Sequence, residues 1–418
     1  MWKPVLALLL TYAYAAGSEA QARIHQVTRT PGFVALWDFV LRDAGGRFTA
    51  HQPPGSPHDF HLDPINYVLD YWQQGRPATN ADFPLLGRGP FGQAIRIRAE
   101  TNPDFRPCLV IPRDRLHDTP LDVKGPGRSM SMVVWLIRES GNHAVAGIWH
   151  EGTDLGNAAA RVEHGKRQYA LFAGLAANNG AAAVHVSENG RGSFGDRYAR
   201  NLATTPEVMP AVPADAPPGK LDQSWQVAGF TFDNRNHTVT AYLNGQATDY
   251  WIEDPQHHPF FRWPARGWQQ AELHRQPGLQ EGEDPAFPKD QYYEPPESKP
   301  RKRVVERSTT EERQELQTFG FTKVRVTYRR EGNGPWQPVR RELVALKANP
   351  YWFPHDLYNP GTKEEGGPFT IGRVIHTSKT VGFTGYIGGV AVFSKALSPS
   401  EMRRLAHLAK TGPIPNGN

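Results

Sequence analysis

The residues best suited to do chemistry are concentrated at positions 149–154, which read Trp149-His150-Glu151-Gly152-Thr153-Asp154. This run places an imidazole close to two carboxylates at the end of an apolar, strand-like segment. Carboxylate oxygens are ligands that Ca²⁺ prefers, and an imidazole beside a carboxylate can act as a general acid or base. Trp149, His150, Glu151 and Asp154 are therefore candidate binding residues for a divalent cation, with calcium as the candidate, or for an acid/base pair; the sequence makes no cofactor certain. The same pattern is also typical of polar loop residues that only contact water.

A second group of candidates is a set of aromatic residues within positions 249–321. Its members are Trp251, Trp263, Trp268, Tyr292 and Tyr293. The apolar face of a pyranose ring packs on Trp or Tyr, while its hydroxyls form hydrogen bonds with Arg, Asn and Asp side chains. These rings are candidates for a sugar-sized cleft. The alternative is that they anchor a long loop to the rest of the protein.

A scaffold that could position these residues is most clearly visible as a hairpin in residues 224–245. Val239, Ala241 and Leu243 alternate with polar or β-favouring residues, which is the period-two spacing of a strand with one buried face. The preceding run, 225–232, is apolar on both faces, which predicts a strand covered on both sides. The polar link 233–237 has side chains that favour turns.

The hairpin also carries a family resemblance. It is similar to the hairpin of laminin G-like, concanavalin A-like lectin and glucanase domains at Trp225, Val227, Ala228, Thr231, Asp233 and the ending Tyr242-Leu243-Asn244-Gly245. Residues 383–402, preceded by Phe369-Thr370-Ile371-Gly372, are similar to the closing strand of that family. Gly388 and Gly389 stand where the family usually has acidic residues, so any contact made by those carboxylates is missing. The resemblance implies an all-β, concanavalin A-like jelly-roll sandwich of two antiparallel sheets.

Composition agrees with short strands joined by turns, since the 418 residues include 40 Gly and 37 Pro. Further strands are expected at 34–39, 94–98, 129–137, 144–149, 167–175 and 182–188, with a second hairpin at 321–330 and 340–346. Helices are expected at 308–318 and at 399–410, the latter with a capping box formed by Ser398 and Glu401. Long loops are expected at 43–92 and 202–221, and an insertion at 249–321.

The first 22 residues have the features of a secretory signal peptide. Lys3 precedes an apolar stretch, and Ala20-Gln21-Ala22 is a small-x-small cleavage site, with Ala13-Tyr14-Ala15 as an alternative. The apolar stretch is too short for a membrane anchor, and no later segment is long enough to span a bilayer. The remaining residues, 23–418, are expected to form a single domain that is secreted, periplasmic or at the cell surface.

The cysteine count and the net charge indicate how the protein is stabilised and which kinds of partner it favours. Cys108 is the sole cysteine, so no internal disulfide can form and stability must come from the core. The formal net charge of +5 is mild for this length, which favours anionic partners without indicating nucleic acid.

Motifs of known catalytic machinery are absent from the sequence. Jelly-roll glycosidases place two carboxylates at alternating positions of one strand, and no E-x-D-x-E run is present. There is also no G-x-S-x-G, H-E-x-x-H or P-loop motif. The resemblance, together with the absence of these motifs, therefore implies an exported laminin G-like protein that binds a polysaccharide or cell-surface glycan, including an anionic one. The alternatives are a glycoside hydrolase or lyase on the same fold, and a surface or structural protein without a sugar site.

Overall fold

The computed structural model describes residues 18–409 except 142–143, 153–165, 175–178, 191–201, 280, 281, 283, 286, 298, 377, 378, 380 and 381. Most of the expected signal peptide therefore lies outside the described residues. Residues 18–28 form a helix whose Ile24 and Val27 are buried, and Nη1 of Arg23 donates to the carbonyl of Pro90 (3.2 Å). The chain is thus part of the fold from about Arg23 onward. No described helix combines the length and the apolar composition needed to cross a membrane.

The first sheet is built around the expected hairpin. Its strands are β1 (Phe33–Trp37), β3 (Ile95–Ile97), β5 (Met130–Ser140), β10 (Gln226–Asp233), β11 (Thr238–Leu243), β17 (Tyr351–Trp352) and β19 (Thr384–Phe393). They follow the order β1-β19-β5-β10-β11-β17, with β3 also paired to β19. In the hairpin, Ala228 lies opposite Leu243 and Asp233 lies opposite Thr238, so the predicted pairing of β10 with β11 is confirmed.

The second sheet has seven strands in the order β2-β4-β18-β6-β7-β8-β9. They are β2 (Asp63–Asn66), β4 (Pro107–Ile111), β18 (Phe369–Ile371), β6 (Ala144–His150), β7 (Lys166–Phe172), β8 (Ala181–Val186) and β9 (Leu202–Val208). Neighbouring strands of this sheet are antiparallel. The strands expected at 144–149, 167–175 and 182–188 are β6, β7 and β8.

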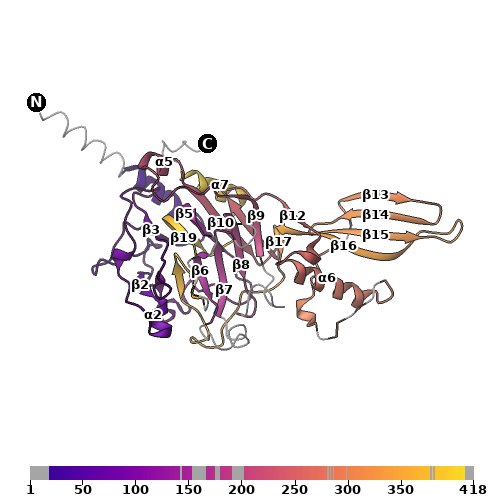
Figure 1. Cartoon of the computed structure of the whole chain (residues 1–418), viewed down its shortest axis with the longest axis horizontal. Helices are drawn as coiled ribbons and strands as arrows, with labels where there is room; N and C mark the ends of the chain where they lie inside the picture. The colour runs from indigo at the N-terminus through magenta and orange to yellow at the C-terminus, as the bar shows by residue number, and fades with distance from the viewer. Residues whose placement is uncertain are drawn as a thin grey trace, which may run out of the picture.

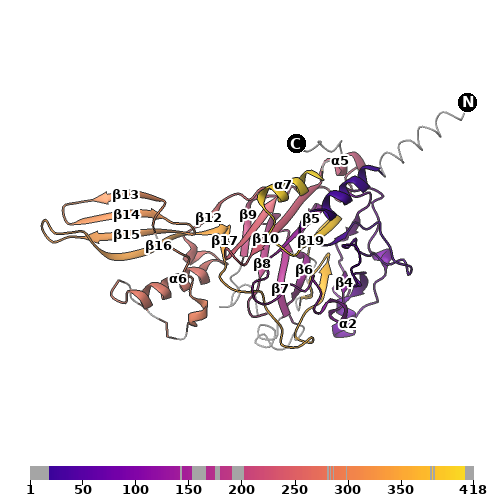
Figure 2. The same ribbon diagram turned by 180° about the vertical axis from the view of Figure 1, so that it is seen from behind.

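The two sheets pack face to face around one hydrophobic core (Figures 1 and 2). Met132 and Phe230 of the first sheet belong to the same buried cluster as Leu171 and Val184 of the second. The rings of Tyr169 and Phe230 meet across the interface with centroids 6.4 Å apart. Removing these apolar side chains from water is the main stabilising contribution, at about 25 cal/mol per Å². The predicted all-β antiparallel fold with a short C-terminal helix is confirmed.

The outer face of the first sheet is also covered, which explains why β10 is apolar on both sides. Trp225 and Val227 pack in a second cluster with Met402 and Leu405 of α7 (Pro399–His407). Ser398 and Glu401 form the expected capping box of that helix. A Cβ at Gly245, where φ is +77°, would lie 2.7 Å from Cα of Arg403, so this hairpin end needs glycine to approach α7.

Two segments expected as long loops contain regular structure. Residues 43–92 include β2, α2 (Tyr67–Trp72) and η1 (Asn80–Asp82). Residues 202–221 begin with β9 and end in α5 (Pro218–Asp222). In β9, Leu202 and Ala203 are buried, so the first residues of this segment join the core before its Pro-rich part begins.

Residues 250–349, which we call the arm, carry a third sheet that projects from one end of the sandwich (Figure 1). Its strands are β12 (Tyr250–Glu253), β13 (Lys302–Ser308), β14 (Glu312–Thr318), β15 (Thr322–Arg329) and β16 (Gln337–Asn349), in the order β12-β16-β15-β14-β13. The helix α6 (Arg262–Arg275) lies beside it, with η3 (Pro255–His257) and η4 (Lys289–Gln291) at the connections. At the base of the arm, the side-chain amide of Asn349 accepts a hydrogen bond from the backbone N–H of Ala241 (2.8 Å) and donates one to the carbonyl of Ala241 (3.0 Å). These bonds fix the arm to β11.

The arm confirms one expectation and corrects another. The predicted hairpin at 321–330 and 340–346 is β15 paired with β16. The predicted helix at 308–318 is wrong, because these residues form the end of β13, a turn and β14. Thr309 Oγ1 accepts from the backbone N–H groups of Glu311 and Glu312, a cap-like pattern that here closes the turn. Pairing of β14 with β15 on its other side then determines the strand.

Candidate functional site

Trp149 and Glu151, two of the sequence candidates, face a buried polar network. The indole N–H of Trp149 donates to Oε1 of Glu151 (3.0 Å). The other oxygen, Oε2, lies 2.7 Å from Nε2 of His376 and 3.6 Å from Nη2 of Arg167. Both carboxylate oxygens are therefore held by protein donors. Asp154 lies outside the described residues.

His150, the neighbour of these two residues, is 4% exposed. The pKa of His150 is lowered to about 3, mainly by burial and to a smaller extent by the positive charges of Lys166 and Arg167. Its Nδ1 accepts from the backbone N–H of Gly152 (2.9 Å), so the neutral ring carries its proton on Nε2. No described residue accepts a hydrogen bond from Nε2. His150 thus offers one uncharged N–H donor.

We expect the imidazole of His150 to stay neutral between pH 8 and pH 5. The unfolded chain protonates with a pKa of about 6.5, whereas the folded chain does not until about pH 3. Stability linked to His150 is therefore complete above pH 6.5 and falls toward pH 3, by at most about 1.4 kcal/mol per pH unit. Histidine NMR signals, assigned by their loss in His150→Gln, measure this. A His150 signal that titrates near pH 6.5 would contradict the buried, neutral state.

His150 lines a cavity of about 580 Å³, which we call the His150 cavity. It lies where β4 and β6 end and where β7 and β18 begin. Its lining residues are Ile65, Asp70, Tyr71, Val110, Pro112, Arg113, Asp114, His150, Lys166, Lys363, Glu364, Gly366, Pro368 and Ile375. The apolar members supply packing surface, and the charged members supply donors and acceptors. Such a mixture is typical of small-molecule binding sites.

The helix α2 carries an aromatic ring to this cavity. Its N-cap residue is Asn66, a buried side chain that accepts from the N–H of Val68 (3.2 Å) and donates to the carbonyl of Asp104 (2.9 Å). Tyr67 and Val68 then pack in a buried cluster with residues of the second sheet. This anchoring leaves Tyr71 42% exposed, with its ring edge-to-face to His150 and centroids 5.2 Å apart.

Another part of the lining depends on a buried ion pair. Arg113 contacts Asp122 through two hydrogen bonds, Nη1 to Oδ1 (2.7 Å) and Nη2 to Oδ2 (2.9 Å). Burial alone would raise the pKa of Asp122, but the hydrogen bonds and charge of Arg113 hold that pKa below its usual value. A Cβ at Gly366 would collide with the guanidinium of Arg113, so glycine lets this loop close over the pair.

Lys166 is a cation in the cavity without an ionic partner among the described residues. It is half-buried at the start of β7, and no described carboxylate lies within ion-pair distance of its Nζ. Burial lowers the pKa of Lys166, and the charge of Glu364 opposes this shift. By contrast, the other lysine of the cavity, Lys363, is paired with Asp114. Lys166 is therefore the ammonium most available to a ligand.

The aromatic residues of the arm are not brought together in one cleft. Trp268 is 1% exposed and Tyr293 is buried against Tyr351 and Trp352. The remaining three rings are half-buried. The ring centroid of Trp251 lies 5.0 Å from the ammonium of Lys323 and 5.5 Å from that of Lys347. Trp263 lies 5.5 Å from the guanidinium of Arg262, and Tyr292 stacks on Phe287 with centroids 6.2 Å apart. Most of their surface is used for packing and cation–π contacts within the arm.

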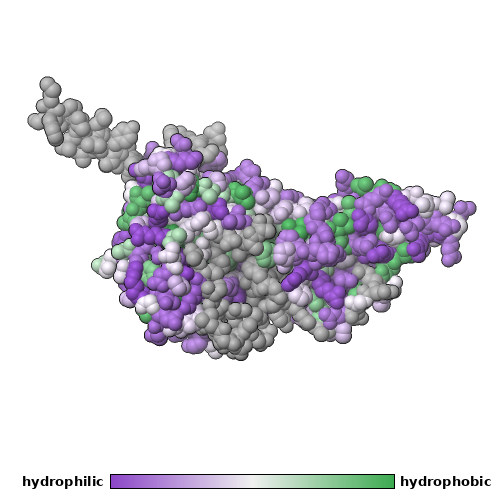
Figure 3. Space-filling view, in the orientation of Figure 1, coloured by the Kyte–Doolittle hydropathy of each residue, from purple (hydrophilic) through white to green (hydrophobic). Residues whose placement is uncertain are grey.

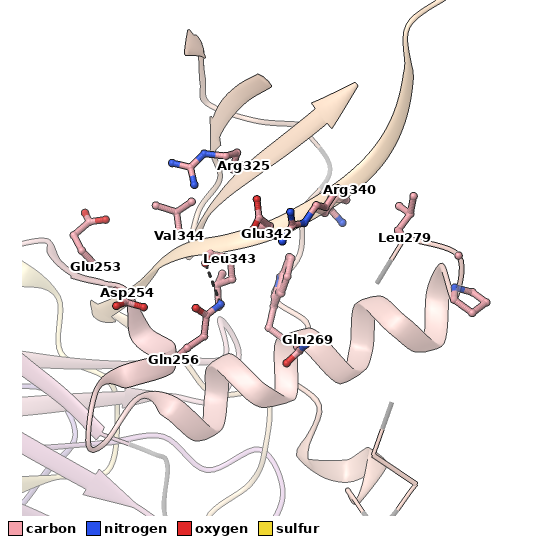
Figure 4. Close-up of a pocket in the computed structure, with 14 residues that line it drawn as sticks. Glu253, Asp254, Gln256, Gln269, Leu279, Arg325, Arg340, Glu342, Leu343 and Val344 are labelled. Atoms are coloured by element: carbon pink, nitrogen blue, oxygen red, sulfur yellow. Dashed lines mark hydrogen bonds and ion pairs between the residues drawn. The ribbon is translucent and has the colours of Figure 1, made fainter. Parts of the chain in front are cut away.

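A larger cavity, the arm cavity, lies between α6 and β16 with a volume of about 1200 Å³ (Figure 4). Trp268 and Gln269 of α6 line it, facing Arg340, Arg341 and Glu342 of β16. Its arginines are already neutralised. Arg340 lies 2.8 Å from Glu342, and Arg341 lies 2.6 Å from Glu272 and 3.0 Å from Glu297. Despite its size, this cavity offers a ligand fewer free charges than the His150 cavity.

Sequence reasoning found one member of the His150 cavity and missed the rest. Tyr71 and Asp70 belong to a segment expected to be a loop, although its apolar cluster at 65–72 with Asn66 as a cap is a usable helix signal. Lys166 and Glu364 have no local signal, because they lie in ordinary polar surroundings and are joined to the site only by the fold. Among the described residues, no group of three or more His, Cys, Asp and Glu side chains is placed to hold a metal ion.

Comparisons with known proteins give structural neighbours only. No family model and no curated protein sequence matches the chain. Among solved structures, it aligns with domain 4 of a GH43 extracellular arabinanase from Geobacillus stearothermophilus in complex with arabinotriose. The identity is 10% and the TM-score 0.37, over 90% of this chain and 98% of that one.

Two further alignments are with toxin domains. One is the ligand-binding domain of botulinum neurotoxin serotype D in complex with N-acetylneuraminic acid (6% identity, TM-score 0.34), and the other is the serotype G binding domain (6% identity, TM-score 0.36). Both cover 90% of this chain, which spans about half of theirs, 50% and 51%. At these identities no residue of the His150 cavity can be transferred from a neighbour.

Proposed function

We propose that this protein is an exported glycan-binding protein and that its binding site is the His150 cavity. The observation that carries the proposal is the exposed ring of Tyr71, which lies edge-to-face to His150 at a cavity of about 580 Å³. An exposed aromatic face beside fixed hydrogen-bonding groups suits a pyranose, whose ring has one apolar face and a rim of hydroxyls.

Four polar groups of the cavity have a direct role in this proposal: those of His150, Asp70, Asp114 and Lys166. The Nε2–H of His150 donates to a ring or hydroxyl oxygen, and it remains a neutral donor over the physiological pH range because of the lowered pKa. The carboxylates of Asp70 and Asp114 accept hydrogen bonds from sugar hydroxyls. The site therefore pairs one aromatic platform with donors and acceptors, as sugar recognition requires.

Lys166 favours an anionic saccharide, whereas the carboxylates of Asp70 and Glu364 in the same cavity favour the hydroxyls of that saccharide. An ammonium without an ionic partner in a half-buried position is stabilised by an incoming carboxylate or sulfate, which forms a charge-assisted hydrogen bond. A uronic acid or a sulfated sugar supplies that group. Export rests on the features of residues 1–22, and the single cysteine is compatible with an oxidising compartment.

Replacing Tyr71 with alanine should weaken saccharide binding while leaving the fold intact. Removing a stacked ring from a binding site costs about 1 to 2 kcal/mol, which is about a five- to thirtyfold loss of affinity. Unfolding should change by less than about 1 kcal/mol because the ring is 42% exposed. Titration of uronic acid oligosaccharides against the wild type, Tyr71→Ala and Tyr71→Phe measures this, and Tyr71→Phe should retain most of the affinity. Equal affinity of all three proteins would exclude Tyr71 as the platform.

A further inference from the structure

The arm ends in a strand that is open on one side. The sheet order β12-β16-β15-β14-β13 makes β13 an edge strand, and Figures 1 and 2 show it as the outermost strand of the arm. All seven residues of β13 are exposed. No described strand pairs with its outer edge, so a row of backbone N–H and C=O groups faces water. An edge of this kind can accept a further strand.

The side chains of β13 combine exposed apolar groups with free positive charge. Val304 is 42% exposed and Val305 is 55% exposed. Figure 3 shows apolar surface along the upper edge of the arm, where Figure 1 places this strand. Exposed cations lie on and just before the strand, and none of them forms an ion pair within the described part of the chain: Lys299, Arg301, Lys302, Arg303 and Arg307.

The charges determine which partner fits this edge. The one acidic residue of β13, Glu306, is neutralised by Arg325 (2.6 Å). All unpaired charge along the edge is therefore positive, so pairing with β13 of a second copy would bring like charges together. The bulge between Val305 and Arg307 affects a second copy and a peptide alike, so charge decides between the two partners. A strand with acidic side chains has the complementary charge.

We propose that β13 is a docking edge for an extended acidic peptide segment of a partner protein, which adds to the arm sheet as a further antiparallel strand. Backbone hydrogen bonds along residues 302–308 hold the peptide. Lys302, Val304 and Arg307 share one face of β13, and Arg303 and Val305 share the other. Carboxylates on one face of the peptide meet Lys302 and Arg307, and apolar residues on its other face cover Val305. This interaction is separate from the His150 cavity and does not depend on saccharide binding.

The test uses the full chain and a labelled peptide of alternating glutamate and valine, with binding followed by fluorescence anisotropy. We expect Arg307→Glu to weaken binding about tenfold and Arg404→Glu, an equal charge change at an exposed position of α7, to leave it unchanged. The same peptide methylated on alternate backbone nitrogens keeps its side-chain charge but cannot donate backbone hydrogen bonds to β13. It should also bind about tenfold more weakly. Amide exchange in residues 302–308 should slow when the unmodified peptide is present.

Three results would overturn the proposal. They are no binding of the peptide, equal binding by Arg307→Glu, and equal binding of the methylated peptide. In the last case, β13 would attract polyanions by charge alone, and a sulfated polysaccharide should compete with the peptide at low salt but not at high salt.

Discussion

Replacing Trp268 with alanine is expected to lower the free energy of unfolding by about 3 to 5 kcal/mol. The indole is 1% exposed and its ring lies 5.7 Å from the guanidinium of Arg341, at the contact between α6 and the arm sheet. Truncation leaves a hole that the surrounding arm cannot fill. Saccharide affinity should not change, because the ring is too deeply buried to stack on a sugar.

Trp251→Ala is the matched control for this prediction. That ring is half-buried and lies beneath two lysine ammonium groups, so its removal should cost about 1 kcal/mol. Thermal or denaturant unfolding measures stability, and a saccharide titration measures binding. If Trp268→Ala left stability unchanged and selectively reduced binding, the arm cavity would be the sugar site and our assignment to the His150 cavity would be wrong.

The free energy of unfolding is expected to fall by a similar amount in Asp122→Asn. The variant keeps the shape of the side chain but leaves the charge of Arg113 buried without a counter-ion, which costs about 3 to 5 kcal/mol. Because Arg113 is also packed beneath Gly366, the wall of the His150 cavity should loosen, and saccharide affinity should fall with stability. Chemical denaturation and a titration on the folded variant separate the two effects.

The control for Asp122→Asn is Asp222→Asn, which removes a surface ion pair with Arg88 (3.0 Å). Exposed pairs of this kind contribute about 0 to 1 kcal/mol. A loss in Asp122→Asn no larger than in this control would show that the Arg113–Asp122 pair does not support the wall.

The sandwich could be predicted from the sequence because its signals are local. In the β10–β11 hairpin, alternation and turn residues both indicate the observed register. The capping box of α7 is likewise contained in a few consecutive residues. The helix predicted at 308–318 failed because Thr309 and Glu312 have the spacing of a cap but close a strand turn, and only the long-range pairing with β15 decides between the two.

The candidate site was only partly predictable because its members come from distant parts of the chain. Consecutive strand residues point to opposite faces, so Trp149 and Glu151 join a buried network while His150 reaches the cavity. The other groups come from distant positions, with Tyr71 on α2 and Glu364 after the arm. No local pattern connects them.

The most direct test of the proposed site is a calorimetric titration of a uronic acid oligosaccharide and of its carboxyl-reduced, neutral form. We expect the acidic form to bind the wild type and to lose about tenfold in affinity in Lys166→Gln, since a hydrogen bond to a charged group contributes about 1.5 kcal/mol or more. Lys220→Gln, at an exposed position of α5, should behave as the wild type. The reduced form should bind more weakly to the wild type and should not distinguish it from Lys166→Gln. Equal binding of the acidic saccharide by the wild type and Lys166→Gln, or no binding by either, would contradict an anionic glycan site in the His150 cavity.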